Sequence, residues 1–164
     1  MKLPILTGLL ILFAVLATSA EQQLPEKFLG KFELTTSENF DEYLSAKGVG
    51  WLIRKMIAMA GVTKSFEKGS SPGSYRIRNF TSKKDTDYDN VQIGKEFTAE
   101  GLDSTQHKIT FSVDSSRNNL LETHDRFETE NSKPETYEYF FEGETLVMKM
   151  QYKDVSCKRF FKRV

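Results

Sequence analysis

Alternation of apolar and polar residues constrains the fold of this chain more than any other feature. After Gly61, apolar residues recur at every second position in three clear segments, Ile109–Val113, Tyr137–Phe141 and Leu146–Tyr152. A period of two is typical of strands with one buried face. Turn-forming residues separate the segments, at positions 71–73, 115–119, 131–134 and 142–143. The pattern predicts an antiparallel meander of about ten strands, one of which precedes a short helical region.

A sheet of this width seldom stays open. Closure into a barrel removes its exposed edges, and a barrel wider than about eight strands tends to enclose a cavity. The chain of 164 residues contains 13 Phe, 6 Tyr and one Trp, which is enough for one folded core and argues against disorder. We therefore expect one domain that holds a ligand, with the helices covering one mouth of the barrel.

The helical region is predicted over Ser37–Met59. Ser37 or Thr36 is the expected N-cap of a first turn with an acidic start, and Gly48 and Gly50 divide the region into two short helices. The second helix has an apolar stripe made of Val49, Leu52, Ile53, Met56, Ile57 and Ala60. We interpret Met56 and Met59 as packing residues of a lid.

Two basic residues of the second helix, Arg54 and Lys55, lie off the apolar stripe. Helical geometry places residues outside such a stripe on the opposite, solvated face. Both side chains are therefore predicted to face solvent.

The N-terminus has the composition of a secretory signal peptide. One basic residue is followed by an apolar run over positions 3–17 and by small residues at 18–20. The run is short for a membrane span of ~20 residues and no basic cluster follows it, although an uncleaved anchor is the alternative. We predict a signal peptide over residues 1–20 and a domain over 21–164.

The expected product is secreted, and that location makes one sequence motif relevant. Asn79-Phe80-Thr81 is the one N-glycosylation triplet of the chain. A glycan on Asn79 is the functional interpretation. An unmodified strand residue is the alternative.

Composition excludes several classes of function. The chain has 23 basic and 23 acidic residues, and a zero net charge argues against general nucleic-acid binding. Cys157, the one cysteine, cannot form an internal disulfide and is interpreted as an apolar wall residue. His107 and His124 stand in no ligand spacing. We expect no metal, no cofactor and no nucleic-acid partner.

Motifs of known catalytic sites are also absent from the sequence. It contains no Gly-x-Ser-x-Gly, no His-Glu-x-x-His and no glycine-rich phosphate loop. The many carboxylates are interpreted as solvated faces. We expect a protein that is not an enzyme, with a remote hydrolase as the alternative.

The last strand places a charge on an apolar face. Val155, Cys157, Arg159 and Phe161 share one face of the segment 155–162. A guanidinium inside a cavity costs several kcal/mol unless it is paired, and its rigid fork matches a carboxylate. Arg159 is thus interpreted as the anchor of an acidic head group. The alternatives are a structural arginine held by a glutamate or water, and a register that leaves it outside.

Several segments, in this order and spacing, resemble the fatty-acid-binding protein family. They are Gly30-Lys31-Phe32-Glu33-Leu34, Asn39-Phe40-Asp41-Glu42-Tyr43-Leu44, Gly48-Val49-Gly50, Gly94-Lys95-Glu96-Phe97 and residues 155–161. The resemblance covers residues 24–164. Residues 102–111 and 135–139, together with the signal peptide, are most similar to the secreted nematode branch.

The resemblance implies a fold and a set of contacts. The fold is a calycin-like, ten-stranded, up-and-down barrel capped by a helix-turn-helix, a monomer that holds one long-chain fatty acid. Phe40 and Tyr43 are then ligand contacts. The lid residues are Leu52, Met56, Arg54 and Lys55, and the two basic ones would make transient contact with anionic membranes.

Family members commonly fix the carboxylate with two arginines and a tyrosine. The resemblance puts Arg159 at the last arginine, Phe161 at the tyrosine and Tyr139 at the other arginine. Only one of the three usual anchors is thus plainly present. The predicted function is extracellular binding, with transport or sequestration, of long-chain fatty acids. The alternatives are a carrier of retinoids or other apolar lipids, and a structural lipid-sequestering protein of an extracellular layer or egg envelope.

Overall fold

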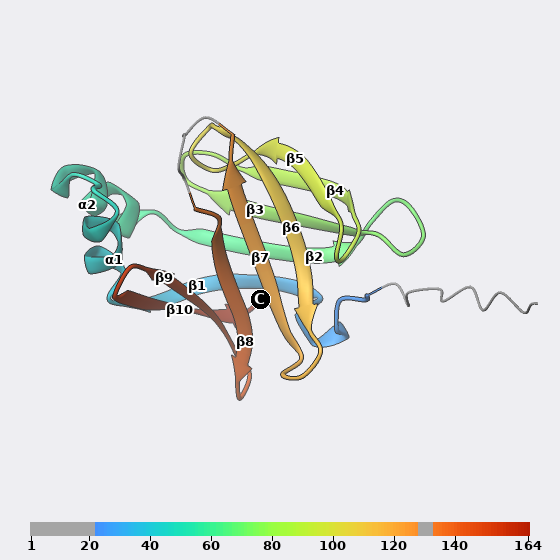
Figure 1. Cartoon of the computed structure of the whole chain (residues 1–164). Helices are drawn as coiled ribbons and strands as arrows, with labels where there is room; N and C mark the ends of the chain where they lie inside the picture. Colours follow the sequence, from blue (N-terminus) through green and yellow to red (C-terminus); the bar gives the residue numbers. More distant parts are fainter. Residues whose placement is uncertain (1–21, 128–132) are drawn as a thin grey trace, which may run out of the picture.

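The computed structural model describes residues 22–127 and 133–164, and within them ten antiparallel strands curve into a nearly closed barrel (Figure 1). The elements are η1 (Glu26–Phe28), β1 (Gly30–Glu38), α1 (Phe40–Ala46), α2 (Trp51–Met59), β2 (Val62–Lys68), β3 (Tyr75–Thr81), β4 (Thr86–Val91), β5 (Glu96–Glu100), β6 (Gln106–Asp114), β7 (Asn119–Arg126), β8 (Glu135–Glu142), β9 (Thr145–Tyr152) and β10 (Val155–Arg163). The predicted meander and barrel are confirmed. The predicted signal peptide lies outside the described residues.

The sheet order is β4-β3-β2-β1-β10-β9-β8-β7-β6-β5, so every neighbour is sequential except the pair β1 and β10. Strands β4 and β5 stand at the two ends of this order and are not paired to each other. Side chains join them instead: the Tyr88 hydroxyl donates to the Glu100 carbonyl at 3.0 Å, and the Tyr88 and Phe97 rings lie 5.5 Å apart. The barrel is therefore closed at this seam by side chains rather than by a backbone ladder.

The predicted period of two agrees with the observed burial. Ile109 and Phe111 on β6, and Leu146, Met148 and Met150 on β9, are buried. On β10, Cys157, Arg159 and Phe161 are buried while their neighbours are more exposed. The alternation thus assigned the inner faces of these strands correctly.

Aromatic rings pack around η1, which lies at the end of the barrel away from the two helices (Figure 1). Phe32 lies 6.2 Å from Phe66 and 6.0 Å from Phe141, and Phe28 of η1 lies 5.4 Å from Phe141. Phe28 and Phe32 have no exposed surface. Burial of such large rings is strongly favourable, so this end is a packed core. Open space is left nearer the other end.

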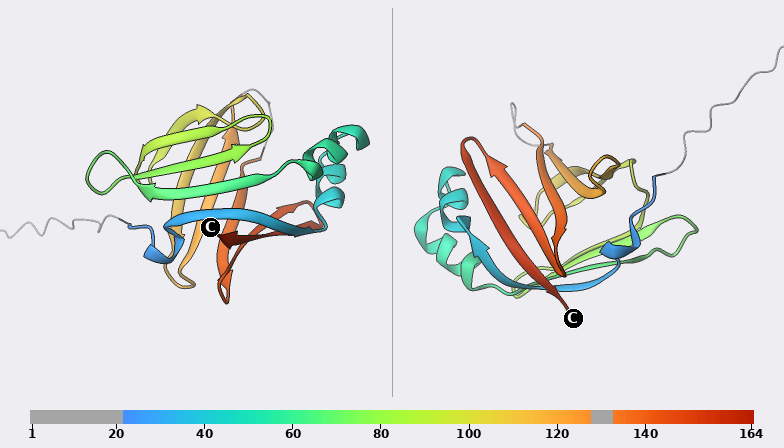
Figure 2. Two further views of the ribbon diagram at one scale, coloured as in Figure 1. Left: turned by 180° about the vertical axis from the view of Figure 1, so that it is seen from behind. Right: turned by 90° about the horizontal axis from the view of Figure 1, so that it is seen from below.

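The two helices stand between β1 and β2, as Figure 2 shows from behind and from below. Their division into two is confirmed, and Gly48 between them has a φ of +82°, which only glycine adopts freely. The predicted cap at Ser37 or Thr36 is wrong, because both residues belong to β1. Helix α1 follows Asn39, whose left-handed φ of 54° turns the chain out of the strand.

Helix α2 packs mainly against α1, whereas α1 packs against β9 and β10. None of the residues of α2 is buried. Leu52 is 58% exposed, Met56 41% and Met59 87%, so the packing role predicted for these methionines is wrong. No helix within the described ranges is long and apolar enough to cross a bilayer.

The two basic residues of α2 differ from each other. Lys55 is exposed, as predicted. Arg54 is not: its Nε lies 3.1 Å from Asp41 Oδ1 and its Nη1 donates to the Val49 carbonyl at 2.9 Å. The prediction that Arg54 faces solvent is therefore wrong, since this side chain ties α2 to α1.

Candidate functional site

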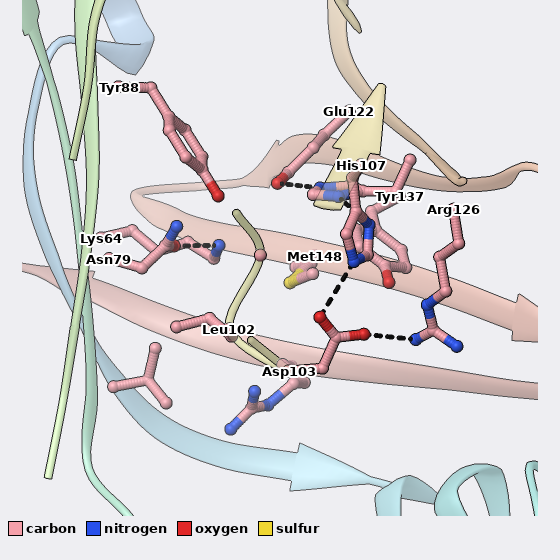
Figure 3. A pocket seen from close by; sticks show the side chains of 14 residues that line it. Lys64, Asn79, Tyr88, Leu102, Asp103, His107, Glu122, Arg126, Tyr137 and Met148 are labelled. Atoms are coloured by element: carbon pink, nitrogen blue, oxygen red, sulfur yellow. Dashed lines mark hydrogen bonds and ion pairs between the residues drawn. The ribbon is translucent and has the colours of Figure 1, made fainter. Parts of the chain in front are cut away.

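Inward-facing side chains leave a cavity of about 170 Å³ inside the barrel. Figure 3 shows Lys64 and Asn79 on one wall, with Glu122, His107 and Arg126 on the opposite wall. The lining residues are Val62, Lys64, Asn79, Tyr88, Gly101, Leu102, Asp103, His107, Glu122, His124, Arg126, Tyr137, Met148 and Arg159. The cavity thus combines apolar side chains with an unusual number of buried ionisable groups.

Arg159 lies inside, as the alternation of β10 predicts, and is 9% exposed. Its Nε donates to Ser37 Oγ at 3.4 Å across the β1–β10 pair, and its guanidinium lies 4.2 Å from the centre of the Phe40 ring. Within the described ranges no carboxylate forms an ion pair with it. Burial lowers the pKa of Arg159 to about 10, so the side chain stays charged at neutral pH.

Arg159 also borders a second hollow of about 530 Å³, which lies between the end of β1, the start of α1 and the end of α2. Phe40, Met59 and Gly61 are among its other lining residues. The guanidinium therefore stands where the barrel interior meets the groove beside the helices.

Lys64 of β2 is a second buried cation, 6% exposed. Its Nζ donates to Asn79 Oδ1 at 2.6 Å, and Asn79 Nδ2 donates to Thr86 Oγ1 at 2.9 Å. The three residues are cross-strand partners on β2, β3 and β4. Burial lowers the pKa of Lys64; the charge of Glu122 raises it in part, and the charge of Arg159 lowers it further.

Glu122 of β7 is the buried anion of the cavity. The Tyr139 hydroxyl donates to its Oε2, and His124 Nε2 lies 2.8 Å from its Oε1. Burial alone would raise the pKa of Glu122, but the Lys64 charge, the His124 contact and the Tyr139 hydroxyl outweigh burial and hold the pKa at about 2. Glu122 is therefore ionised at neutral pH.

Two histidines connect Glu122 to Asp103. His124 Nδ1 lies 3.1 Å from His107 Nδ1, and His107 Nε2 lies 2.9 Å from Asp103 Oδ1. His107 Nε2 also lies 2.8 Å from Thr105 Oγ1. These contacts thus form a continuous series of polar groups from Glu122 through His124 and His107 to Asp103.

The other residues predicted to contact ligand lie in different environments. Phe40 stacks its ring against the Arg159 guanidinium. Tyr43 is buried, but its hydroxyl donates to Glu135 Oε2 at 3.3 Å. Phe161 has no exposed surface and does not line the cavity. Tyr139 is fully buried, and its hydroxyl is committed to Glu122 rather than directed at open space.

Asn79 lies inside the barrel with 4% of its surface exposed. Its side-chain nitrogen, the atom that would carry a glycan, already donates to Thr86. A carbohydrate on that nitrogen has no room in this fold, which argues against glycosylation at Asn79.

Lys64, Glu122 and the histidine contact were not predicted from the sequence. The alternation that found Arg159 would also have found two of them, since Lys64 lies between Val62 and Phe66 and Glu122 two residues after Leu120. The histidine contact needed the hairpin register as well, which pairs Ile109 with His124 and so sets His107 diagonally beside it. Within the described part of the chain no cluster of three or more His, Cys, Asp and Glu side chains could hold a metal ion.

Comparison with known proteins identifies the family. No protein-family model matches the chain. Fatty acid-binding protein homolog 2 of Caenorhabditis elegans is 46% identical over 156 residues, which cover 95% of this chain and 96% of that protein. A fatty acid-binding protein homolog of Ascaris suum is also 46% identical, over 161 residues that cover 96% and 98%. The chain belongs to the fatty-acid-binding protein family.

Solved structures of the family agree with this assignment. As-p18, described as an extracellular fatty acid binding protein, has 48% identity and a TM-score of 0.83, and the match covers 87% of this chain and 100% of As-p18. The REP1-NXSQ fatty acid transporter has 30% identity and a TM-score of 0.69, covering 85% and 98%. The resemblance to the nematode branch is confirmed, and the family consists of lipid-binding proteins rather than enzymes.

Proposed function

We propose that the protein binds one long-chain fatty acid inside the barrel, with the carboxylate at Arg159. The observation that carries the proposal is a buried guanidinium at the cavity wall that meets no carboxylate within the described residues. A charge taken out of water costs several kcal/mol unless an opposite charge compensates it. A fatty acid carboxylate supplies that charge and accepts two parallel hydrogen bonds from the guanidinium.

The hydrocarbon tail provides most of the affinity. A sixteen-carbon chain buries about fifteen methylenes at roughly 0.8 kcal/mol each, which is on the order of 12 kcal/mol before the costs of association. A charge-assisted hydrogen bond contributes roughly 1.5–3 kcal/mol. Val62, Leu102 and Met148 offer apolar surface within the cavity. The tail thus sets the affinity, and Arg159 sets the orientation.

The proposed place of action is outside the cell. The sequence predicts a signal peptide over residues 1–20, and the related As-p18 is described as extracellular. Sequencing of secreted material should begin at Glu21 or within one residue of it. Protein retained in the cytosol with Met1 in place would contradict secretion.

Exposed residues of α2 support a brief contact with membranes during ligand transfer. Trp51, Leu52 and Ile53 are at least half exposed, and Lys55 lies among them. Apolar side chains beside a basic residue on one helix favour the surface of anionic bilayers. The groove that Arg159 and Met59 line is next to this helix.

The test is a calorimetric titration of delipidated protein with oleate. Calorimetry measures heat rather than fluorescence, so the exposed Trp51 does not affect the signal. Saturable binding of one oleate, with no turnover of oleate esters, is the expected result. Mass spectrometry of lipid recovered with the natively produced protein then identifies the ligand. Failure of the delipidated, folded protein to bind oleate would overturn the proposal.

A further inference from the structure

Lys64 is a buried cation of the cavity that the proposed function does not use. It comes from β2, whereas Arg159 comes from β10, and both line the same interior cavity. The ammonium group has three N–H donors, and one acceptor, Asn79 Oδ1, contacts it within the described ranges. A lysine at the wall of a cavity with donors to spare can contact a bound anion.

Neighbouring side chains fix the position of the Lys64 ammonium. Asn79 is itself held by Thr86, so its carbonyl oxygen points at Nζ, and Nζ lies 5.3 Å from the centre of the Tyr139 ring. Glu122 balances the Lys64 charge through space, but no Lys64–Glu122 ion pair within 4.0 Å exists among the described residues. The ammonium is therefore held in place without being saturated by a carboxylate.

The charges of the interior point to the kind of ligand. Lys64 and Arg159 contribute two positive charges, and Glu122 contributes one negative charge. Arg126 also lines the cavity and forms an ion pair with Asp103 at 3.0 Å, so these two charges cancel. Among the described residues, one positive charge of the cavity lining is thus left without a counter-charge, which matches a ligand with a single negative charge.

We infer that Lys64 is a second cationic contact for the ligand head group, which makes the cavity selective for lipids that end in a monoanion over alcohols and esters of the same length. This inference rests on the proposed fatty-acid function. Asn79 and Thr86 are then positioning residues that aim the ammonium, and Glu122 limits the charge of the site to that of one carboxylate.

The first test compares oleate with oleyl alcohol in the full secreted protein, using K64M and the matched control K68M, which removes an exposed lysine from the same strand. K64M should weaken oleate binding about ten- to hundred-fold and leave oleyl alcohol nearly unchanged, while K68M should change neither. Unchanged oleate affinity in folded K64M would overturn the inference. Equal weakening of both ligands would also overturn it, because that is the result of a purely structural role.

A second variant protects the test against misfolding, since K64M leaves the buried Glu122 without its balancing charge. The E122Q single variant and the K64M/E122Q double variant have the same partner network apart from Lys64. Oleate should bind the double variant about ten-fold or more weakly than E122Q. Equal oleate affinities in these two variants would contradict a head-group contact.

The carboxyl carbon of ¹³C-labelled oleate gives a readout that packing does not change. A nearby ammonium stabilises the ionised carboxylate, so the bound carboxyl should titrate at higher pH in K64M than in the wild type. No change in that titration would overturn the inference. If the wild-type protein bound neither oleate nor oleyl alcohol, the proposed function would fail first, and the two failures are thereby distinguished.

Discussion

The inner wall of the barrel and the outer face of α2 reverse the usual distribution of residues. Lys64, Glu122 and Arg159 are buried, each at most 9% exposed, while Trp51 and Leu52 of α2 are 66% and 58% exposed. Soluble proteins rarely bury charges without a partner or expose grouped apolar residues without a function. Arg159 of the first region lines the same groove as Ala58 and Met59 at the end of α2. The difference separates a site that recognises a polar head group from a surface suited to apolar contact.

The largest expected effect tests whether Glu122 belongs to a balanced charge network. Its folded pKa of about 2 lies below the ordinary value of 4.5, so its ionisation stabilises the fold above pH 4.5. That stability should be lost as the pH falls from about 4.5 to about 2, by on the order of 3 kcal/mol. Urea denaturation at a series of pH values measures it.

Glu122→Gln should flatten this pH dependence, whereas Glu144→Gln in the exposed β8–β9 turn should leave it as in the wild type. Some acid sensitivity remains in both variants, because the pKa of Asp103 is also held at about 2. Burial raises the pKa of Asp103, but its contacts with Thr105 and His107 outweigh burial. A Glu122→Gln variant as acid-sensitive as the wild type would mean that the network does not stabilise the ionised carboxylate.

The next effect concerns the head group. Arg159→Gln should weaken oleate binding by roughly 1.5–3 kcal/mol, the contribution of a hydrogen bond to a charged group. Methyl oleate should be almost unaffected, because its tail burial is unchanged. Calorimetric titration of both ligands measures the difference. Equal losses for acid and ester would remove Arg159 from the head-group site.

A smaller effect is expected on the outer face. Lys55→Glu should slow fatty acid transfer to anionic vesicles at least about five-fold at low salt, since loss of one basic residue near such a surface costs about 1 kcal/mol and the new carboxylate adds repulsion. The effect should fade as salt is added, and equilibrium affinity for oleate should not change. Lys149→Glu on β9, away from α2, is the control. Transfer rates that change neither with the Lys55→Glu substitution nor with salt would favour release by diffusion through solvent.

The smallest effect distinguishes the two regions directly. Leu52→Gln with Ile53→Gln should change the free energy of unfolding by no more than about 0.5 kcal/mol, because both side chains are at least half exposed. A buried apolar residue such as Ile109, replaced by alanine, should cost about 2–5 kcal/mol. Thermal or urea unfolding compares them. A loss above about 1 kcal/mol in the α2 variant would show that α2 packs more tightly than its exposure indicates.

Sequence patterns predicted the features that depend on neighbouring residues. Alternation gave the inner faces of β6, β9 and β10, and with them the burial of Arg159; glycines gave the break between the helices. The N-cap was wrong because Ser37 pairs with Arg159 in β1, a contact between residues far apart in the chain. Local capping chemistry at Ser37 cannot reveal such a partner.

The remaining errors have the same origin. An apolar stripe shows which face of a helix is apolar, but not whether another element covers it, and Met59 is 87% exposed. The ion pair of Arg54 with Asp41 depends on the angle between two helices. The contact of His107 with His124 depends on the register of β6 and β7. Each of these needed three-dimensional positions that spacing along one segment does not contain.

The pairing of β1 with β10 has a consequence for how the chain is made. Every other neighbouring pair joins strands that are consecutive in the chain, so it can form as soon as its two strands exist. Leu34 can pair only after Phe161, at the far end of the sequence, has been synthesised. Closing so long a loop is entropically costly. During synthesis, β1 therefore leaves the ribosome first and keeps one edge unpaired until almost the entire chain has followed. We expect the barrel to reach its native state only after translation ends.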